Sequence, residues 1–177
     1  LLKSSDGSTT LRSPAAGPLR SMVVDHVVQA RVIFPGAGYL EMARAAACSA
    51  ELRIRPALAG VFFLQPLVIE SPTMQVECVI AEGRFEIRSG DGEPGVAISD
   101  AAIHCSGDIV ADERHAWHRA DHMATRGRVR GCAIEVAALY DGFDAVGLQY
   151  GPDYRTLEQA WCDGVSAALS RLRARPS

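Results

Sequence analysis

The sequence predicts an α+β fold in which an antiparallel sheet curls around one buried helix. Two observations support this prediction. A helix-like segment near the start is built mostly of small residues, and consecutive strand-like runs separated by turn residues follow it. A helix with small side chains lets its neighbours approach closely, and strands that follow a helix in succession are typical of α+β domains.

The first regular element is expected at residues 22–34. Period-two alternation in this run puts the charged residues on one strand face and His26 among apolar residues on the other. Pro35 and Gly36 break the strand, and residues 39–52 have a helical composition dominated by alanine. We expect this helix to lie inside the fold, wrapped by strands.

The rest of the chain continues with strands, a linker and a second set of elements. Four strand-like runs are expected, at residues 58–69, 74–81, 84–88 and 96–109, with turn signals at 82–83, 89–92 and 106–108 that punctuate or end them. Residues 111–131 are rich in Arg, Asp and Glu and are the best linker candidate. Beyond them we expect a short helix at 134–143 and two strands within 156–172.

The composition excludes several classes of function. The 177 residues include 18 Lys+Arg and 21 Asp+Glu, a net charge of −3, which gives no reason to expect nucleic acid or an anionic membrane as a partner. No apolar run is long enough to span a membrane, and we recognise no signal peptide. The five cysteines are widely spaced without a CxxC motif, so we expect a cytoplasmic protein without a disulfide framework or zinc site.

His26 is the sharpest candidate for chemistry. A histidine held in apolar surroundings stays neutral near pH 7 and can act as a general base. The backbone N–H groups that open the following helix, near Gly36 and Ala37, can hold a carbonyl oxygen as negative charge builds on it. The alternative is a core histidine that bonds a backbone carbonyl, and spacing alone favours that alternative.

Two other histidine-containing segments have simpler explanations. His115, His118 and His122 would share one helix face and could bind a transition metal, but their segment is charged and is typical of solvated surface. His104 precedes Cys105 in a strand pattern, so the two side chains should face opposite ways, which argues against a paired thiol nucleophile.

For two further residues, the sequence allows both a structural and a chemical role. Tyr150 lies in the turn signal at residues 147–152 and is either a hydroxyl donor or an aromatic packed beneath the turn. Glu41 lies in the first turns of the small-residue helix, where it either compensates the helix dipole or acts as an acid.

Several segments, taken in order, match the pattern of one family. His26-x-x-x-Ala30-x-x-x-x-Pro35 matches the motif His-x-x-x-Gly-x-x-x-x-Pro and continues into the characteristic segment at residues 36–43. Further matches follow at residues 63–67, 83–85, 104–107, 140–141, 147–152 and 154–155. With these matches in the right order, the chain resembles, nearly from end to end, the dehydratase domain of modular type I polyketide synthases.

This resemblance implies a double hotdog fold, in which each of two hotdog units wraps a sheet around a central helix. Residues 1–110 would form the first hotdog with the histidine motif, and residues 111–131 would form the polar linker. Residues 132–177 would begin a second hotdog that is incomplete here.

The resemblance also implies a reaction, the loss of water from a β-hydroxyacyl thioester on an acyl carrier protein to give an α,β-enoyl thioester. His26 would abstract the α-proton, and the Gly36 N–H would bind the thioester carbonyl. Tyr150 would lie near the β-hydroxyl, with Gly151 and Pro152 beside it in the substrate site. No metal or redox cofactor is implied, because the elimination only moves protons. The phosphopantetheine arm of the carrier protein would present the substrate. The implied partners are the carrier protein, neighbouring synthase domains and, in the intact synthase, a second copy.

Two departures from the family pattern bear on catalysis. Ala30 replaces the family's glycine, and the motif Asp-x-x-x-Gln/His of the second helix, which supplies the acid, is absent from these 177 residues. We therefore expect the chain to be a piece of a dehydratase whose acid lies beyond Ser177, and two alternatives stay open. The chain is a non-catalytic structural or docking remnant of a synthase module, or Glu41 of a second copy completes the site, as in bacterial single-hotdog dehydratases.

Overall fold

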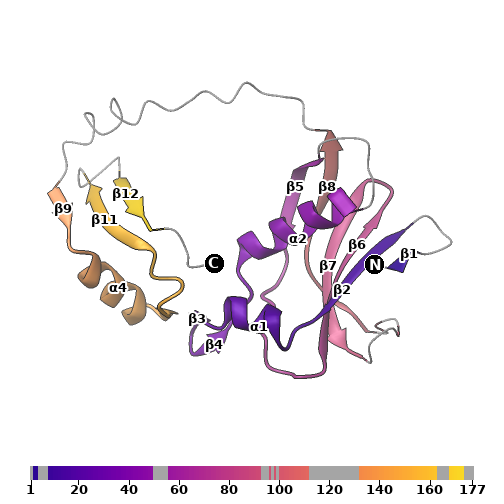
Figure 1. Cartoon of the computed structure of the whole chain (residues 1–177), viewed down its shortest axis with the longest axis horizontal. Coiled ribbons are helices and arrows are strands. Elements are labelled where there is room, and N and C mark those ends of the chain that lie inside the picture. The colour runs from indigo at the N-terminus through magenta and orange to yellow at the C-terminus, as the bar shows by residue number, and fades with distance from the viewer. Residues whose placement is uncertain are drawn as a thin grey trace. The chain divides into compact units, whose positions relative to one another are not determined.

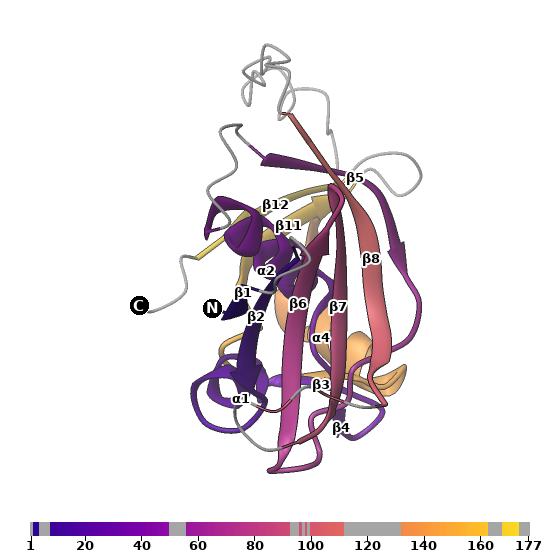
Figure 2. The same ribbon diagram turned by 90° about the vertical axis from the view of Figure 1, so that its right-hand side faces the viewer.

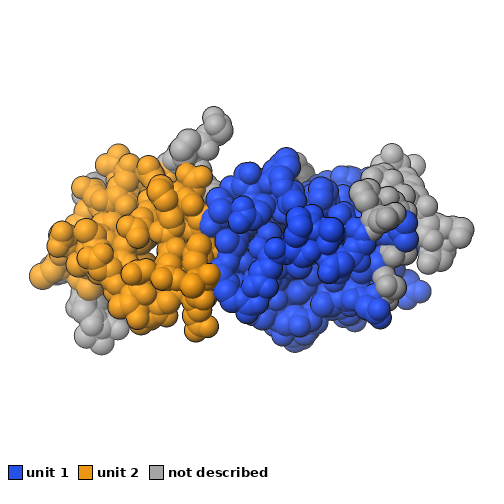
Figure 3. Space-filling model, turned by 90° about the horizontal axis from the view of Figure 1, so that it is seen from below, with its two compact units in different colours: residues 1–24, 31–115 blue, residues 25–30, 116–177 orange. Residues whose placement is uncertain are grey.

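The computed structural model describes two compact units of the chain. It describes residues 2–3, 8–49, 56–92, 96, 98, 100–111, 132–162 and 168–173. Unit 1 contains residues 1–24 and 31–115, and unit 2 contains residues 25–30 and 116–177 (Figure 3). Residues 25–30, which include His26, therefore group with the carboxyl-terminal unit. Most of the expected linker, residues 112–131, lies outside the described residues. No helix in the described part of the chain is long and apolar enough to cross a membrane.

Unit 1 is built on a six-stranded antiparallel sheet (Figures 1 and 2). Its strands, in sheet order, are β1 (Leu2–Lys3), β2 (Thr9–Pro14), β6 (Met74–Ala81), β7 (Arg84–Asp91), β8 (Ala102–Ala111) and β5 (Pro56–Phe63). Glu82 and Gly83, with φ values of 51° and 74°, connect β6 to β7 in a two-residue hairpin turn. The predicted turn at 82–83 and the predicted strand at 74–81 are confirmed.

Helix α2 (Gly36–Ser49) packs on this sheet with one face of small residues. Its buried residues, Tyr39, Ala43, Ala46 and Ala47, follow helical spacing and join the core with sheet residues such as Phe85. The opposite face of the helix is exposed. The helix predicted at 39–52 therefore exists, but it is buried along one face rather than all round.

The single strand predicted at residues 22–34 is wrong. Pro18 at the first helical position begins α1 (Pro18–Val23), and the strand character is confined to β3 (His26–Val28) and β4 (Arg31–Val32). Gln29 and Ala30, with φ values of 49° and 60°, take a turn conformation that separates the two short strands. The alternation of charged and apolar residues over positions 22–34 therefore does not reflect one continuous strand.

Two predicted turns lie inside strands instead. Residues 89–91 belong to β7, and residues 106–108 belong to β8. Gly107 is a strand glycine because the Phe85 ring packs against it: a Cβ atom at this position would lie 2.8 Å from Phe85 Cε1. The glycine makes room for a core aromatic residue and does not mark a chain reversal.

Strand β8 contains a β-bulge at His104. Ile87 pairs with Cys105 and Arg88 pairs with Ile103, so His104 is the extra residue between them. Both His104 and Cys105 are buried. The expectation that their side chains face opposite ways rested on regular alternation, and the bulge interrupts that alternation at this point.

Unit 2 contains helix α4 and short antiparallel strands. Helix α4 (Val136–Ala145) leads to β10 (Leu148–Tyr150), which pairs with β3. A three-stranded sheet has the order β12 (Ala168–Leu172), β11 (Leu157–Cys162), β9 (Cys132–Ile134). The predicted helix near 134–143 and the two predicted strands within 156–172 are confirmed. The Tyr140 hydroxyl accepts a hydrogen bond from the Leu157 N–H and so ties α4 to β11.

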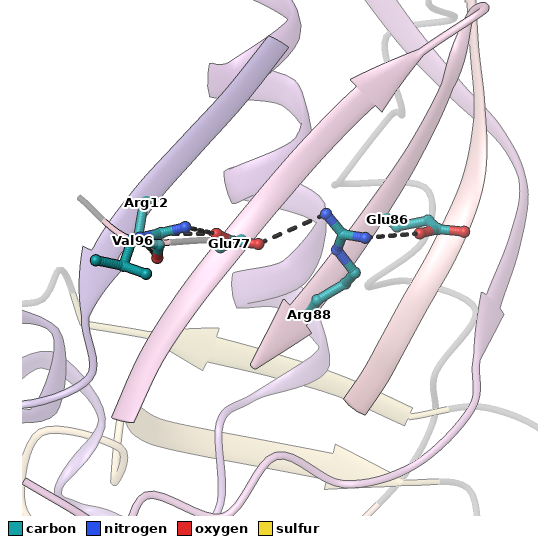
Figure 4. Close-up of polar contacts among 5 residues, drawn as sticks. All are labelled: Arg12, Glu77, Glu86, Arg88 and Val96. Carbon is teal, nitrogen blue, oxygen red and sulfur yellow. Dashed lines mark hydrogen bonds and ion pairs between the residues drawn. The ribbon is translucent and has the colours of Figure 1, made fainter. Parts of the chain in front are cut away.

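A buried ion-pair row crosses three strands on the sheet face opposite α2 (Figure 4). Glu77 of β6 is 3% exposed and accepts from the Arg12 guanidinium of β2. Its other oxygen lies 3.5 Å from Arg88 Nη2 of β7. Arg12 also donates to the Val96 carbonyl, which ties the connection between β7 and β8 to this face. A buried carboxylate of this kind depends on both guanidinium groups, since each charge alone would be desolvated without compensation.

Replacing Glu77 should therefore be costly. We expect Glu77→Ala to lower the free energy of unfolding by about 3–5 kcal/mol, because it leaves two guanidinium groups facing each other without their shared carboxylate. The matched control is Glu70→Ala, which removes the exposed ion pair with Arg31 and should cost about 1 kcal/mol or less. Urea unfolding followed by circular dichroism measures the free energy of unfolding of both variants. Equal losses of stability would contradict the conclusion that Glu77 holds a buried ion pair.

Candidate active site

The pairing of β3 with β10 brings the first two predicted site residues together. His26 lies directly opposite Tyr150 in the antiparallel register. Their ring centroids are 5.4 Å apart with the planes tilted by 31°, and both side chains are half-buried. The predicted base and the predicted hydroxyl therefore lie on the same side of one strand pair, within reach of a single small substrate group.

Tyr154 adds a second aromatic ring to His26. Its ring centroid lies 5.1 Å from that of His26 and 6.3 Å from that of Tyr150, on which it stacks. Tyr154 was not among the predicted site residues. Its position four residues after Tyr150, across a Gly-Pro turn, could have indicated that its ring lies near that of Tyr150. The three rings form one cluster within unit 2, and Phe143 of α4 packs edge-on against Tyr150 behind it.

Gly151 and Pro152 lie in the turn between these two tyrosines. The Gly151 N–H donates to the Asp25 carbonyl at 2.8 Å, so the turn is anchored beside the start of β3. Pro152 is exposed, and its carbonyl accepts from Arg173 Nη2 at 2.7 Å. The structure thus brings Gly151 and Pro152 next to His26 and Tyr150, and their contact with a substrate stays a prediction.

Gly36 lies in unit 1, at the first turn of α2. It is exposed, and a Cβ atom there would lie 3.4 Å from the Phe63 ring. The first N–H groups of a helix have no acceptor within the helix, so a residue at this position can bind a carbonyl oxygen. The binding of a thioester carbonyl by the Gly36 N–H stays a prediction.

Glu41 is a surface residue of α2. Its carboxylate accepts two hydrogen bonds from Arg44, at 3.0 and 2.6 Å, and both side chains are more than half exposed. The hydrogen bond from Arg44 lowers the pKa of Glu41 below its ordinary value. A carboxylate held ionised in this way is a poor proton donor, which weighs against Glu41 as the acid.

The other candidates for chemistry do not form a site in the described part of the chain. His115, His118 and His122 lie outside the described residues. Among the residues that are described, no group of three His, Cys, Asp or Glu side chains is arranged to hold a metal ion. Burial raises the pKa of the Cys105 thiol, which disfavours the thiolate that a nucleophile needs.

His104 belongs to a buried polar cluster in unit 1. One ring nitrogen lies 2.7 Å from Ser89 Oγ and the other lies 3.3 Å from the Gln65 carbonyl. The ring stacks on Tyr39 of α2, with centroids 6.5 Å apart. Burial lowers the pKa of His104 below its ordinary value of 6.5, so the folded protein holds this ring neutral.

This lowered pKa predicts a pH-dependent stability. The unfolded chain takes up a proton at His104 at a higher pH than the folded protein does, so the stabilisation present above about pH 6.5 should decrease as the pH falls below it. In His104→Gln, urea unfolding between pH 7.5 and 5 should show a smaller loss of stability than the wild type. Equal pH dependence in the two proteins would show that His104 is not the group responsible.

A family comparison covers half of the chain. Residues 2–90 match the family model described as the polyketide synthase dehydratase domain. This match includes His26 and Gly36. The chain therefore belongs to the polyketide synthase dehydratase domain family.

Curated relatives of the chain are large polyketide synthases. Polyketide synthase ThaG of Burkholderia thailandensis is 34% identical over an alignment of 168 residues that covers 88% of this chain. The highly reducing polyketide synthase SAT13 of Stachybotrys chartarum is 31% identical over an alignment of 175 residues that covers 82% of this chain. The chain spans only 3% of the first relative and 7% of the second.

Solved dehydratase domains share the fold. A trans-AT polyketide synthase dehydratase domain from Brevibacillus brevis superposes with a TM-score of 0.74 at 22% identity, covering 95% of this chain and 60% of that structure. The dehydratase domain from the CurF module of curacin polyketide synthase gives a TM-score of 0.71 at 23% identity, covering 93% of this chain and 59% of that structure. The α+β fold with a hotdog-like sheet and helix is thus confirmed over somewhat more than half of a dehydratase domain.

Proposed function

We propose that the chain is part of a dehydratase that removes water from a β-hydroxyacyl thioester on an acyl carrier protein, with His26 as the general base. The observation that carries the proposal is the position of His26 opposite Tyr150, in a chain of the dehydratase family. In the CurK dehydratase, replacement of one histidine by phenylalanine gives an inactive mutant, and so does replacement of one aspartate by asparagine. A histidine and a carboxyl group are the pair that this elimination needs.

The proposed reaction moves protons only. The His26 imidazole takes the α-proton, and the electron pair of that C–H bond forms the Cα=Cβ double bond. The Cβ–O bond breaks, and the leaving hydroxyl takes a proton from a carboxylic acid to depart as water. Hydride transfer and Lewis-acid activation have no role in this scheme, so we propose that the reaction needs no redox cofactor or metal. The proton donor would come from the second helix of a complete dehydratase.

Three further residues have proposed binding roles. The Gly36 N–H would bind the thioester carbonyl and stabilise the negative charge that builds on it as the α-proton leaves. The Tyr150 hydroxyl would lie near the β-hydroxyl of the substrate and help to orient the acid. The turn at Gly151 and Pro152 would form the wall of the substrate site beside Tyr150.

The proposed assembly follows from the same family. Residues 1–110, with the histidine motif, would form the first hotdog and residues 132–177 the beginning of a second, in a double hotdog. The phosphopantetheine arm of a carrier protein would deliver the substrate, and the domain would work beside other synthase domains in a homodimeric synthase. The curated relatives, which are multidomain synthases, support this proposal.

The test is intact-mass spectrometry of a β-hydroxyacyl carrier protein incubated with the polypeptide extended to full dehydratase length. We expect the loss of one water from the acyl group, and we expect His26→Ala to slow it about 100- to 10,000-fold, the usual contribution of a general base. The matched control is His118→Ala, which removes a histidine from the charged segment and should leave the rate unchanged.

Two outcomes would overturn the proposal. Full activity of His26→Ala would remove His26 from the role of base. A folded, extended polypeptide that releases no water from any β-hydroxyacyl carrier protein would favour a non-catalytic structural or docking role. The 177-residue chain assayed alone adds a further check, because activity there would require an acid within this sequence.

A further inference from the structure

We propose that Asp25 is a positioning residue, which sets the His26 ring against Tyr150 and Tyr154 by holding the turn that connects the two tyrosines. The inference rests on the proposed role of His26 as the base. It concerns a residue that lies next to His26 in sequence and acts through backbone groups, without itself touching the substrate.

Asp25 binds the turn at two points. Its backbone carbonyl accepts from the Gly151 N–H at 2.8 Å, which extends the pairing of β3 and β10 by one residue beyond the strand ends. Its carboxylate oxygen Oδ2 accepts from the Asp153 N–H at 2.9 Å. One residue thus fixes two backbone groups of the segment that runs from Tyr150 to Tyr154.

Gly151 is small because the Asp25 carboxylate occupies the space beside it. A Cβ atom at position 151 would overlap the carboxylate and would lie 2.7 Å from Oδ2 even at its farther oxygen. The Gly151 carbonyl in turn accepts from the N–H groups of Tyr154 and Arg155, at 3.0 and 3.1 Å. The position of the Tyr154 ring therefore follows from a turn that begins against Asp25.

Two arginines hold the same turn from other directions. Arg155 Nε donates to the Tyr150 carbonyl at 2.7 Å, and Arg173 Nη2 donates to the Pro152 carbonyl at 2.7 Å. Arg155 also lies over the Tyr140 ring of α4, 5.4 Å from its centroid. Backbone groups of four consecutive residues, 150–153, are therefore bound by Asp25, Arg155 or Arg173. Of these three residues, only Asp25 is next in sequence to the strand that carries His26.

The consequence concerns the geometry of the cluster. Tyr150 is placed by strand pairing, whereas Tyr154 depends on the turn, so loss of the Asp25 carboxylate should displace Tyr154 more than Tyr150. The His26 ring would then lose its contact with the Tyr154 ring and become less well oriented. Misplacement of a reacting group by about 1 Å can reduce a rate about 100-fold.

The test compares Asp25→Ala, which removes the acceptor, with Asp25→Asn, which keeps an acceptor oxygen for the Asp153 N–H and removes the charge. In the extended dehydratase we expect Asp25→Ala to lower kcat about 10- to 100-fold with KM within about twofold. We expect Asp25→Asn to retain most of the activity. The matched control is Asp141→Ala, an exposed residue of α4 in the same unit, which should behave as the wild type.

A second measurement does not depend on activity. In NMR spectra of the 177-residue chain, the His26 ring protons, assigned with His26→Gln, should carry ring-current shifts from the two tyrosines. In Asp25→Ala these chemical shifts should move toward those of free histidine. In Asp25→Asn they should remain at the wild-type values. Gly151→Ala, which forces the carboxylate away, should produce the same change as Asp25→Ala and serves if that variant does not fold.

The outcomes separate this inference from the proposed function. Wild-type shifts and activity in folded Asp25→Ala, or Asp25→Asn as impaired as Asp25→Ala, would overturn the positioning role. An active His26→Ala with altered shifts in Asp25→Ala would overturn the role of His26 as base while leaving the structural effect of Asp25 in place.

Discussion

The candidate site depends on the antiparallel pairing of β3 with β10. This pairing brings together two segments that are far apart in the sequence and places His26 opposite Tyr150. Backbone hydrogen bonds set both the spacing of the strands and the identity of the facing residues, and a slip by one residue would send the Tyr150 ring to the other face. The contacts of Asp25 with Gly151 and Asp153 extend the same register into the turn. The relative position of the His26 and Tyr150 side chains is thus set by hydrogen bonds between the two main chains.

Unit 1 is held together mainly by the close packing of a helix on a sheet. Alanines on α2 bring the helix close to the strands, and the core between them is apolar apart from the polar cluster around His104. A second polar cluster, around Glu77, lies on the opposite face of the sheet. Buried hydrogen bonds and ion pairs are costly when their partners are misplaced, so each cluster favours one register over its alternatives.

The family match and the geometry contribute different parts of the functional argument. The match over residues 2–90 covers His26 but ends well before Tyr150. The structure adds that the two rings face each other and that Tyr154 joins them. The family match and this clustering of phenol and imidazole rings together support the proposed dehydratase reaction.

The sequence by itself determined the elements whose signals are local. The hairpin at Glu82-Gly83, the alanine-rich helix α2 and the histidine motif follow from neighbouring residues, and all were predictable. Only the tertiary structure decided the rest. Gln29 and Ala30 divide a strand without a glycine or asparagine to signal it, and Gly107 lies in a strand because a distant Phe85 ring needs its space. Periodicity depends on residues a few positions apart, whereas bulges, register and hydrogen bonds such as that from Asp153 to Asp25 depend on partners that are remote in the chain.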